Sequence, residues 1–400
     1  MTRRQALLTC AASLSGLSAE KTSGGAERIR LLRVPEGGLQ PQMAIDERGL
    51  LHLVYYTGDA HQGDLFYVRS SNFGANFSPA LRVNSQPGSA VAAGTIRGAQ
   101  IALGKNGRLH VAWNGSMQAE PKGPLNPDSG KKGMPMLYTR LNDAAGVAFE
   151  PQRNLMRHSF GLDGGGSIAA DRAGNVYVAW HGIGESEASG SGMKGEARRQ
   201  VWIAKSQDAG RSFSTEEKAW SQPTGACGCC GMKIFTDRQG NVSALYRSAT
   251  EGVHRDIYLL TSNDHARSFQ GSLLHKWNVN ACPMSSMDFA ENGTTVLGAW
   301  ETGGQIYWAR LSGRTAPSEA VSAPGEGKGR KHPRLAINQA GEVLLVWTEG
   351  TGWQKGGSLA YQIYDSAGKP TGEKKQLPGI PAWSFAAATA RPDDGFSIIY

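Results

Sequence analysis

Four of the five cysteines lie in two short segments of the sequence. Three of them form the run Cys227-Gly228-Cys229-Cys230, and the fourth is Cys282. Thiols gathered in this way in an oxidising compartment are expected to form disulfides. The first expectation is therefore two disulfides, with Cys282 bonded to one of the other three cysteines. Four cysteines can form two disulfides in three ways, and one of these includes a bond between the neighbours Cys229 and Cys230.

Thiolates are also ligands for soft metal ions, and a metal site is the second interpretation of these cysteines. Copper(I) or zinc would suit the sulfur ligands, and Met284, Met287 or His332 could add further ligands. The spacing Cys-x-Cys-Cys differs from the usual zinc-finger patterns. Free thiols are the third interpretation, and the sequence predicts no particular cofactor.

Ionisable and aromatic residues form a second set of candidates. Three glutamates could act as general acid or base in a hydrolytic reaction: Glu251, Glu301 and Glu349. Other side chains could hold a substrate, because guanidinium groups pair with carboxylates through parallel hydrogen bonds. The expected substrate-binding residues are Arg97, Arg247, His254, Arg255, His332 and Trp353, with Arg334 as a further candidate arginine.

A repeated unit along the chain predicts which elements position these residues. The unit is an apolar strand, a tight turn and a second apolar strand that ends in an aromatic residue. It occurs seven times, at residues 41–55, 98–113, 166–180, 231–246, 286–300, 333–347 and 385–400. A third strand follows each of the first six copies, and a weaker fourth strand leads to the next copy. Four short antiparallel strands at this spacing are typical of one propeller blade.

The repeat therefore predicts an all-β propeller of four-stranded antiparallel blades over residues 28–400, with seven blades, or six as the alternative. Residues 29–34 have a strand pattern and are expected to pair with the last copy and close the ring. In such a blade, the connections between strands two and three, and between blades, open on one face around the channel mouth. The candidate residues fall mainly in these connections, of which residues 114–134 and 181–200 are unusually long. We call this face the mouth face.

The turns after the third strands carry a recurring motif. Residues 206–213 read Ser-Gln-Asp-Ala-Gly-Arg-Ser-Phe, residues 262–269 read Ser-Asn-Asp-His-Ala-Arg-Ser-Phe, and residues 70–77 read Ser-Ser-Asn-Phe-Gly-Ala-Asn-Phe. The motif resembles the Asp box, Ser-x-Asp-x-Gly-x-x-Trp/Phe, of the sialidase-like propellers. We expect these turns to stabilise the fold without taking part in chemistry. They should lie opposite the mouth face, on what we call the Asp-box face.

The resemblance implies an exo-glycosidase that acts on an acidic or other exposed sugar. Sialidases hold the sugar carboxylate with three arginines, and they use a tyrosine nucleophile assisted by a glutamate, with an aspartate as the acid. This chain departs from that pattern at two points. The run Leu32-Arg33-Val34-Pro35 comes nearest to the first arginine motif but falls in the ring-closing segment, and the cysteine cluster is foreign to sialidases.

The N-terminus and the composition predict an exported protein. Arg3 and Arg4 precede a short apolar stretch, so residues 1–19 resemble a twin-arginine export signal and residues 20–27 a linker. The periplasm or the extracellular space is the expected location, without a membrane span. The net charge of +8 falls to +6 without Arg3 and Arg4, and the scattered basic residues argue against nucleic acid as a partner.

Two functions from different classes follow for this expected monomer. The first is a glycoside hydrolase at the mouth face of blades four to six. The second is a non-catalytic propeller that binds a glycan or a protein there, with a carbohydrate or a small acidic ligand as the expected partner. A thiolate metal or redox site is the third interpretation.

Overall fold

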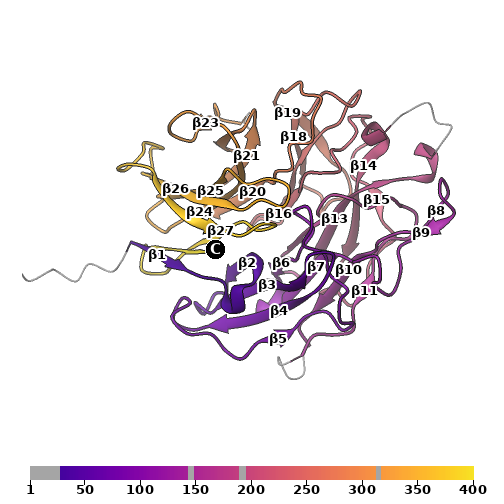
Figure 1. Cartoon of the computed structure of the whole chain (residues 1–400), viewed down its shortest axis with the longest axis horizontal. Coiled ribbons are helices and arrows are strands. Elements are labelled where there is room, and N and C mark those ends of the chain that lie inside the picture. Colours follow the sequence, from indigo (N-terminus) through magenta and orange to yellow (C-terminus); the bar gives the residue numbers. More distant parts are fainter. Residues whose placement is uncertain (1–27, 143–147, 189–194, 312–316) are drawn as a thin grey trace, which may run out of the picture.

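The computed structural model describes residues 28–142, 148–188, 195–311 and 317–400, and these residues form a seven-bladed β-propeller. Within these ranges the only helical segments are four short 3-10 turns: η1 (Pro35–Gly37), η2 (Lys105–Gly107), η3 (Glu185–Glu187) and η4 (Gly195–Arg198). The blades follow one another around the ring in sequence order, so the colours of Figure 1 run once around it. The fold class and the count of seven blades are confirmed, and the alternative of six is wrong.

Six blades are four-stranded antiparallel sheets, and each runs outward from the channel in chain order. Blades one to three consist of β2 (Leu39–Ile45), β3 (Leu51–Asp59), β4 (Gln62–Ser70) and β5 (Leu81–Arg82); β6 (Gln100–Leu103), β7 (Leu109–Asn114), β10 (Met136–Arg140) and β11 (Arg153–Asn154); and β12 (Ser167–Ala170), β13 (Val176–Ile183), β14 (Arg199–Ser206) and β15 (Glu217–Lys218). A small hairpin of β8 (Leu125–Asn126) and β9 (Lys131–Lys132) lies in the long connection of blade two.

Blades four to six repeat the same order. They consist of β16 (Lys233–Thr236), β17 (Val242–Arg247), β18 (Ile257–Ser262) and β19 (Gln270–His275); β20 (Asp288–Asn292), β21 (Thr295–Thr302), β22 (Gln305–Arg310) and β23 (Val321–Ser322); and β24 (Arg330–Ile337), β25 (Val343–Glu349), β26 (Gly357–Tyr364) and β27 (Lys375–Ile380).

The seventh blade closes the ring and has three strands. It contains β28 (Ala387–Ala390) and β29 (Phe396–Ile399) from the C-terminus, and β1 (Ile29–Leu32) from the N-terminus joins β29 in parallel. The inner strand β28 contacts both β24 and β2, so the ring is continuous. The predicted pairing of the N-terminal segment with the last copy is confirmed, and its parallel direction distinguishes this blade from the others.

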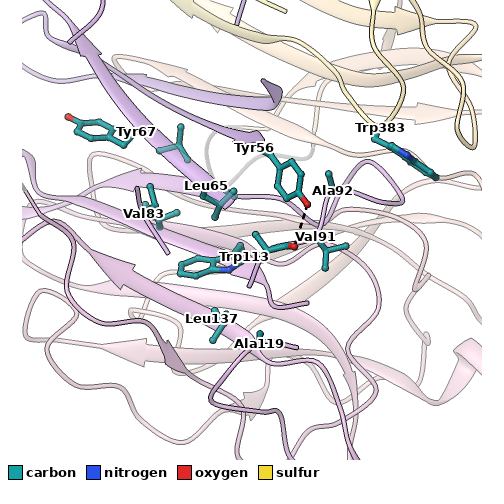
Figure 2. Close-up of a cluster of buried hydrophobic side chains, with 14 of the residues drawn as sticks. Tyr56, Leu65, Tyr67, Val83, Val91, Ala92, Trp113, Ala119, Leu137 and Trp383 are labelled. Carbon is teal, nitrogen blue, oxygen red and sulfur yellow. Dashed lines mark hydrogen bonds between the residues drawn. The ribbon is translucent and has the colours of Figure 1, made fainter. Parts of the chain in front are cut away.

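The core lies between neighbouring blades, where the aromatic residues that end the second strands are buried. Trp113, Trp180, Trp300 and Trp347 are all almost completely excluded from solvent. Figure 2 shows Trp113 packed in the cluster that joins blades one and two. An aromatic residue recurs at the same position in each repeat of the sequence because it packs one blade against the next.

The motif turns have the capping geometry that the sequence predicts. Ser206 Oγ accepts a hydrogen bond from the amide of Gly210 (2.9 Å), and Asp208 Oδ1 accepts one from the amide of Ser212 (2.9 Å). Although burial opposes it, the hydrogen bonds from Ser212 and Ser206 lower the pKa of Asp208 to about 2. The ring of Phe213 packs edge-on against Tyr138 of the neighbouring blade, 4.7 Å between centroids. These contacts stabilise the turn and the packing of neighbouring blades, which explains the motif without a role in chemistry.

The two faces of the propeller are separated as predicted. In blade three, Val176 lies opposite Ser206 at the Asp-box end, whereas Ile183 lies opposite Arg199 at the mouth end. The amide of Cys227 donates to the carbonyl of Arg247, the last residue of β17, which places the cysteine run at the mouth end. The cysteine run and the Asp-box turns therefore lie on opposite faces.

Residues 1–27, with the predicted export signal and linker, lie outside the described residues. Among the described residues, we find no helix of the length and hydropathy needed to span a membrane.

Candidate functional site

Three thiols converge on the mouth face. Sγ of Cys227 lies 3.3 Å from Sγ of Cys229 and 3.4 Å from Sγ of Cys230. All three sulfur atoms lie within 4.8 Å of one another. The amide of Cys230 donates to the carbonyl of Cys227 (3.3 Å), and this tight turn directs the three side chains to one point. Cys227 and Cys230 are buried, and Cys229 is half-buried.

The predicted disulfides are absent from the four cysteines that the structure describes. Cys227, Cys229, Cys230 and Cys282 are all free. The sulfur separations of 3.3 and 3.4 Å exceed the roughly 2.05 Å of an S–S bond. The first expectation is therefore not met in this structure, and the thiols are arranged as a cluster of three.

Cys282 joins the cluster from the next blade connection, together with a glutamate. A carboxylate oxygen of Glu196 and the sulfur atoms of Cys229 and Cys282 lie within 4.8 Å of one another. The amide of Gly228 donates to Glu196 Oε1 (3.0 Å), and the Arg255 guanidinium pairs with the same carboxylate. Because Cys282 is exposed, this second group of ligand atoms connects the buried thiols to solvent.

Positive charge surrounds the thiols and favours the ionised form of one of them. Burial opposes ionisation of Cys230. Hydrogen bonds from Cys227 and Cys229, and then the charge of Arg247, nevertheless hold the pKa of Cys230 well below its usual range. A thiolate at Cys230 is the form of cysteine that binds metal ions.

A buried histidine next to the cluster has no partner. His181 is fully buried, and neither of its ring nitrogens has a hydrogen-bond partner among the described residues. A Cβ placed on Gly164 would meet both Nδ1 of His181 (3.0 Å) and the carbonyl of Cys230 (2.6 Å), so these groups face one gap. Burial lowers the pKa of His181 to about 4, which leaves the imidazole neutral.

Two of the three predicted catalytic glutamates are engaged in ion pairs. Arg247 donates to Glu301 Oε2 (2.9 Å), and both side chains are buried. Burial raises the pKa of Glu301, and the charge of Arg247 opposes that rise. Glu349 pairs with Arg330 (3.1 Å) and with Lys374 (3.0 Å). It ends β25 and therefore lies on the mouth face, as predicted. The two carboxylates thus have separate sets of partners.

The other predicted residues of blade four lie nearer to solvent. The Glu251 side chain is 78% exposed and lies 3.6 Å from Nε2 of His254. Nδ1 of His254 is within 2.6 Å of Oδ1 of Asn278. Arg255 instead faces inward and pairs with Glu196, beside the thiols.

Of the remaining predicted residues, His332 and Trp353 line one small space on the mouth face, and Arg97 lies outside its lining. Arg97 donates to the carbonyl of Asp163 (2.7 Å) and pairs with its carboxylate. His332 is buried, and burial lowers its pKa to about 3. Trp353 is 56% exposed and packs edge-on against Trp383, 4.6 Å between ring centroids. The further candidate Arg334 lies within the central channel and not on the mouth face.

The structure adds Glu196, His181 and Asp163 to the site, and sequence reasoning missed all three. Glu196 falls in the long connection of blade three and His181 near the end of β13, just before it, so loop length was the only signal that pointed to them. Asp163 pairs with both Arg97 and Arg199 and thereby joins blades two and three. A contact between blades cannot be read from the sequence of either blade.

Comparisons with known proteins give the fold. No protein-family model and no curated protein sequence matches the chain. Among solved structures, it is similar to a protein of unknown function from Dyadobacter fermentans, with 12% identity and a TM-score of 0.52 over 88% of this chain and 97% of that one. It is similar also to an α-L-arabinanase from Penicillium chrysogenum, solved with arabinobiose, with 13% identity and a TM-score of 0.51 over 84% of this chain and 95% of that one.

The chain is also similar to the Hadza microbial sialidase Hz136, with 13% identity and a TM-score of 0.47 over 85% of this chain and 74% of that one. The two structures with TM-scores above 0.5 share the fold of this chain, and at such identities the likeness shows the fold alone. The chemistry of this chain has to be argued from its own residues.

Proposed function

We propose that this protein binds copper(I) through the thiolates of Cys227, Cys229 and Cys230 on the mouth face. The observation that carries the proposal is the convergence of three thiols from one tight turn. Metal–sulfur bonds of about 2.3 Å place three sulfur atoms around one ion about 4 Å apart. The observed separations of 3.3 and 3.4 Å need only small side-chain rotations to reach that spacing.

The donor set favours copper(I) over zinc. Structural zinc sites use four ligands in a tetrahedron, whereas the buried cluster offers three soft sulfur atoms. Soft thiolates select copper(I). The nearby guanidinium groups of Arg247 and Arg255 would offset the negative charge that three thiolates bring to a single cuprous ion. Cys282 and Glu196 would give the ion a route from solvent to the buried thiols.

The test is a competitive titration of the reduced, oxygen-free full chain with copper(I) against a chromogenic chelator, with zinc in a parallel series. We expect a single copper ion to be retained, with a thiolate charge-transfer band in the ultraviolet and only sulfur neighbours in X-ray absorption spectra. Retention that survives alkylation of the thiols would contradict the assignment, as would zinc binding more tightly than copper(I).

Carbohydrate binding on the same face is the second candidate, and the exposure of Trp353 favours it. Its ring is 56% exposed beside Trp383, which holds it in place by edge-on packing. An exposed, fixed aromatic face is a surface on which the apolar face of a sugar can pack. Hydrolysis has weaker support, because Glu301 and Glu349 would first have to leave their cationic partners.

A glycan-array experiment with Trp353→Ala beside the parent chain tests this candidate. We expect binding of at least one glycan by the parent and loss of about 10-fold or more in affinity for the variant, because a stacked ring contributes on the order of 1 kcal/mol or more. Release of sugar from a bound glycan would restore the glycosidase interpretation, and Glu251→Gln is then the first variant to assay. Equal binding by parent and variant would remove Trp353 from the site.

A further inference from the structure

The central channel contains a second site whose residues have no part in the thiolate cluster. Its volume is about 270 Å³, and all seven inner strands contribute to its lining. The lining is mixed: it includes polar residues and also the apolar residues Met43, Ile101, Ile168, Phe289, Leu335 and Ala387. The lining extends to Ala170 and Thr236, which end their strands at the Asp-box face. The channel is therefore a well on that face.

The mouth end of the well is closed. The space bordered by Ile96, Gly231, Arg334 and Phe385 has a volume of only about 10 Å³, which is at the lower limit for one water molecule. A Cβ added to Gly165 would collide with the carbonyl of Ile96, so the connections that precede β6 and β12 pack directly against each other at this end. A ligand in the well is thus separated from the mouth face.

Two cations and one carboxylate lie at the closed end of the well. Lys233 lies 3.7 Å from Asp288 Oδ1, and Oδ2 of the same carboxylate accepts the amide of Leu335 (3.0 Å). Arg334 lies over the ring of Phe385, 4.5 Å from its centroid. Asp288 can neutralise only one of the two cations, so the end of the well carries a net positive charge.

Two of the residues that line the well also carry a buried donor without a partner. Arg334 is 6% exposed, and its Nε has no hydrogen-bond partner among the described residues. Gln42 also lines the channel, is 5% exposed, and its Nε2 likewise lacks a partner in the described part of the chain. Buried donors are nearly always satisfied, and each one left without a partner is costly.

The electrostatics agree with this geometry. Burial lowers the pKa of Lys233, although Asp288 opposes the shift. Burial likewise lowers the pKa of Arg334, which Asp288 also opposes. Both cations are therefore held where their charge is insufficiently balanced, and a bound anion would stabilise both.

We propose that the well binds a small monocarboxylate, with its carboxylate at Arg334 and Lys233 and its alkyl part against the apolar residues of the lining. The planar guanidinium pairs with a carboxylate through two parallel hydrogen bonds, which a halide cannot accept together. The volume of about 270 Å³ restricts the ligand to a few carbon atoms. The apolar residues of the lining, such as Met43 and Ile168, offer contacts to an alkyl group but none to a second charge.

Calorimetric titration of the full chain with propionate tests the proposal, with propionamide as its neutral isostere and chloride as an inorganic anion. We expect propionate to bind, propionamide to show no binding, and chloride to compete only weakly. Binding of propionamide as tight as that of propionate would overturn the proposal, as would binding of chloride alone.

Two variants with opposite charge changes locate the site. Asp288→Asn keeps an acceptor for the amide of Leu335 but removes the negative charge, so propionate should bind about 10-fold more tightly. Lys233→Met should lower the affinity for propionate by about 10-fold or more, because it removes one of the two cations. Asp288→Asn decides the question even if Lys233→Met fails to fold, since an unchanged or weaker affinity in that variant contradicts the charge assignment.

Discussion

Replacing Cys230 with serine is expected to lower the affinity for copper(I) by at least about 100-fold. Residues that only support metal ligands change affinity by about 10- to 100-fold, and the loss of a ligand should exceed that range. Cys230 is the thiol whose ionised form is favoured, by two thiol hydrogen bonds and by the charge of Arg247, so its loss removes the strongest ligand. The competitive chelator titration described above measures the change.

Cys282→Ser is the matched control for this variant. It also removes one thiol, but an exposed one that is not part of the buried group of three. We expect its equilibrium affinity to change less than 10-fold and its rate of copper uptake to fall if Cys282 helps the ion to enter. Equal losses of affinity in the two variants would show that the buried group is not the site.

Replacing Arg247 with methionine should destabilise the propeller by about 3–5 kcal/mol. The substitution leaves the buried carboxylate of Glu301 without its cation, and this is the usual cost of breaking a buried ion pair from one side. It also removes the hydrogen bond from Arg247 to the carbonyl of Arg255 (2.9 Å). Urea unfolding followed by tryptophan fluorescence measures the free energy of unfolding.

The double variant Arg247→Met with Glu301→Gln is the control, because it removes the unpaired charge. We expect it to recover part of the lost stability. The loss in the single variant should also depend on pH. Burial raises the pKa of Glu301 above its ordinary 4.5. The loss of stability in the single variant should therefore be smallest at and below about pH 4.5, and it should grow as pH rises through the raised pKa and the buried carboxyl ionises. A loss that is independent of pH and unchanged in the double variant would assign it to packing alone.

The predicted blade order depended on local signals that are strong in this chain. The turns and the aromatic residue that ends each second strand recur in every unit, and Trp113, Trp180, Trp300 and Trp347 are buried because each one packs between blades. Ring closure by residues 29–34 could also be predicted, since a strand without its own hairpin partner must pair elsewhere. The parallel direction of β1 had no local signal.

The candidate site could be predicted in its location but only partly in its contacts. Connections between strands two and three, and between blades, open on the same face of a propeller. This placed the cysteine run and Glu301 on the mouth face, and the structure agrees. The rule could not show that Glu301 is paired with Arg247, or that Glu349 is paired with Arg330. Such pairs join residues from separate strands or blades, and their distance depends on how the sheets twist and pack.

The sequence by itself determined the repeating strands, their turns and the face on which each connection opens, because these depend on residues close together in the chain. Tertiary structure alone decided that Glu196 reaches Cys229 and Cys282, that His181 lies beside Cys230, and that Lys233, Asp288 and Arg334 share the end of the channel. Those groups come from different blades. Their chemistry exists only once the ring has closed and desolvation has fixed which charges remain without a partner.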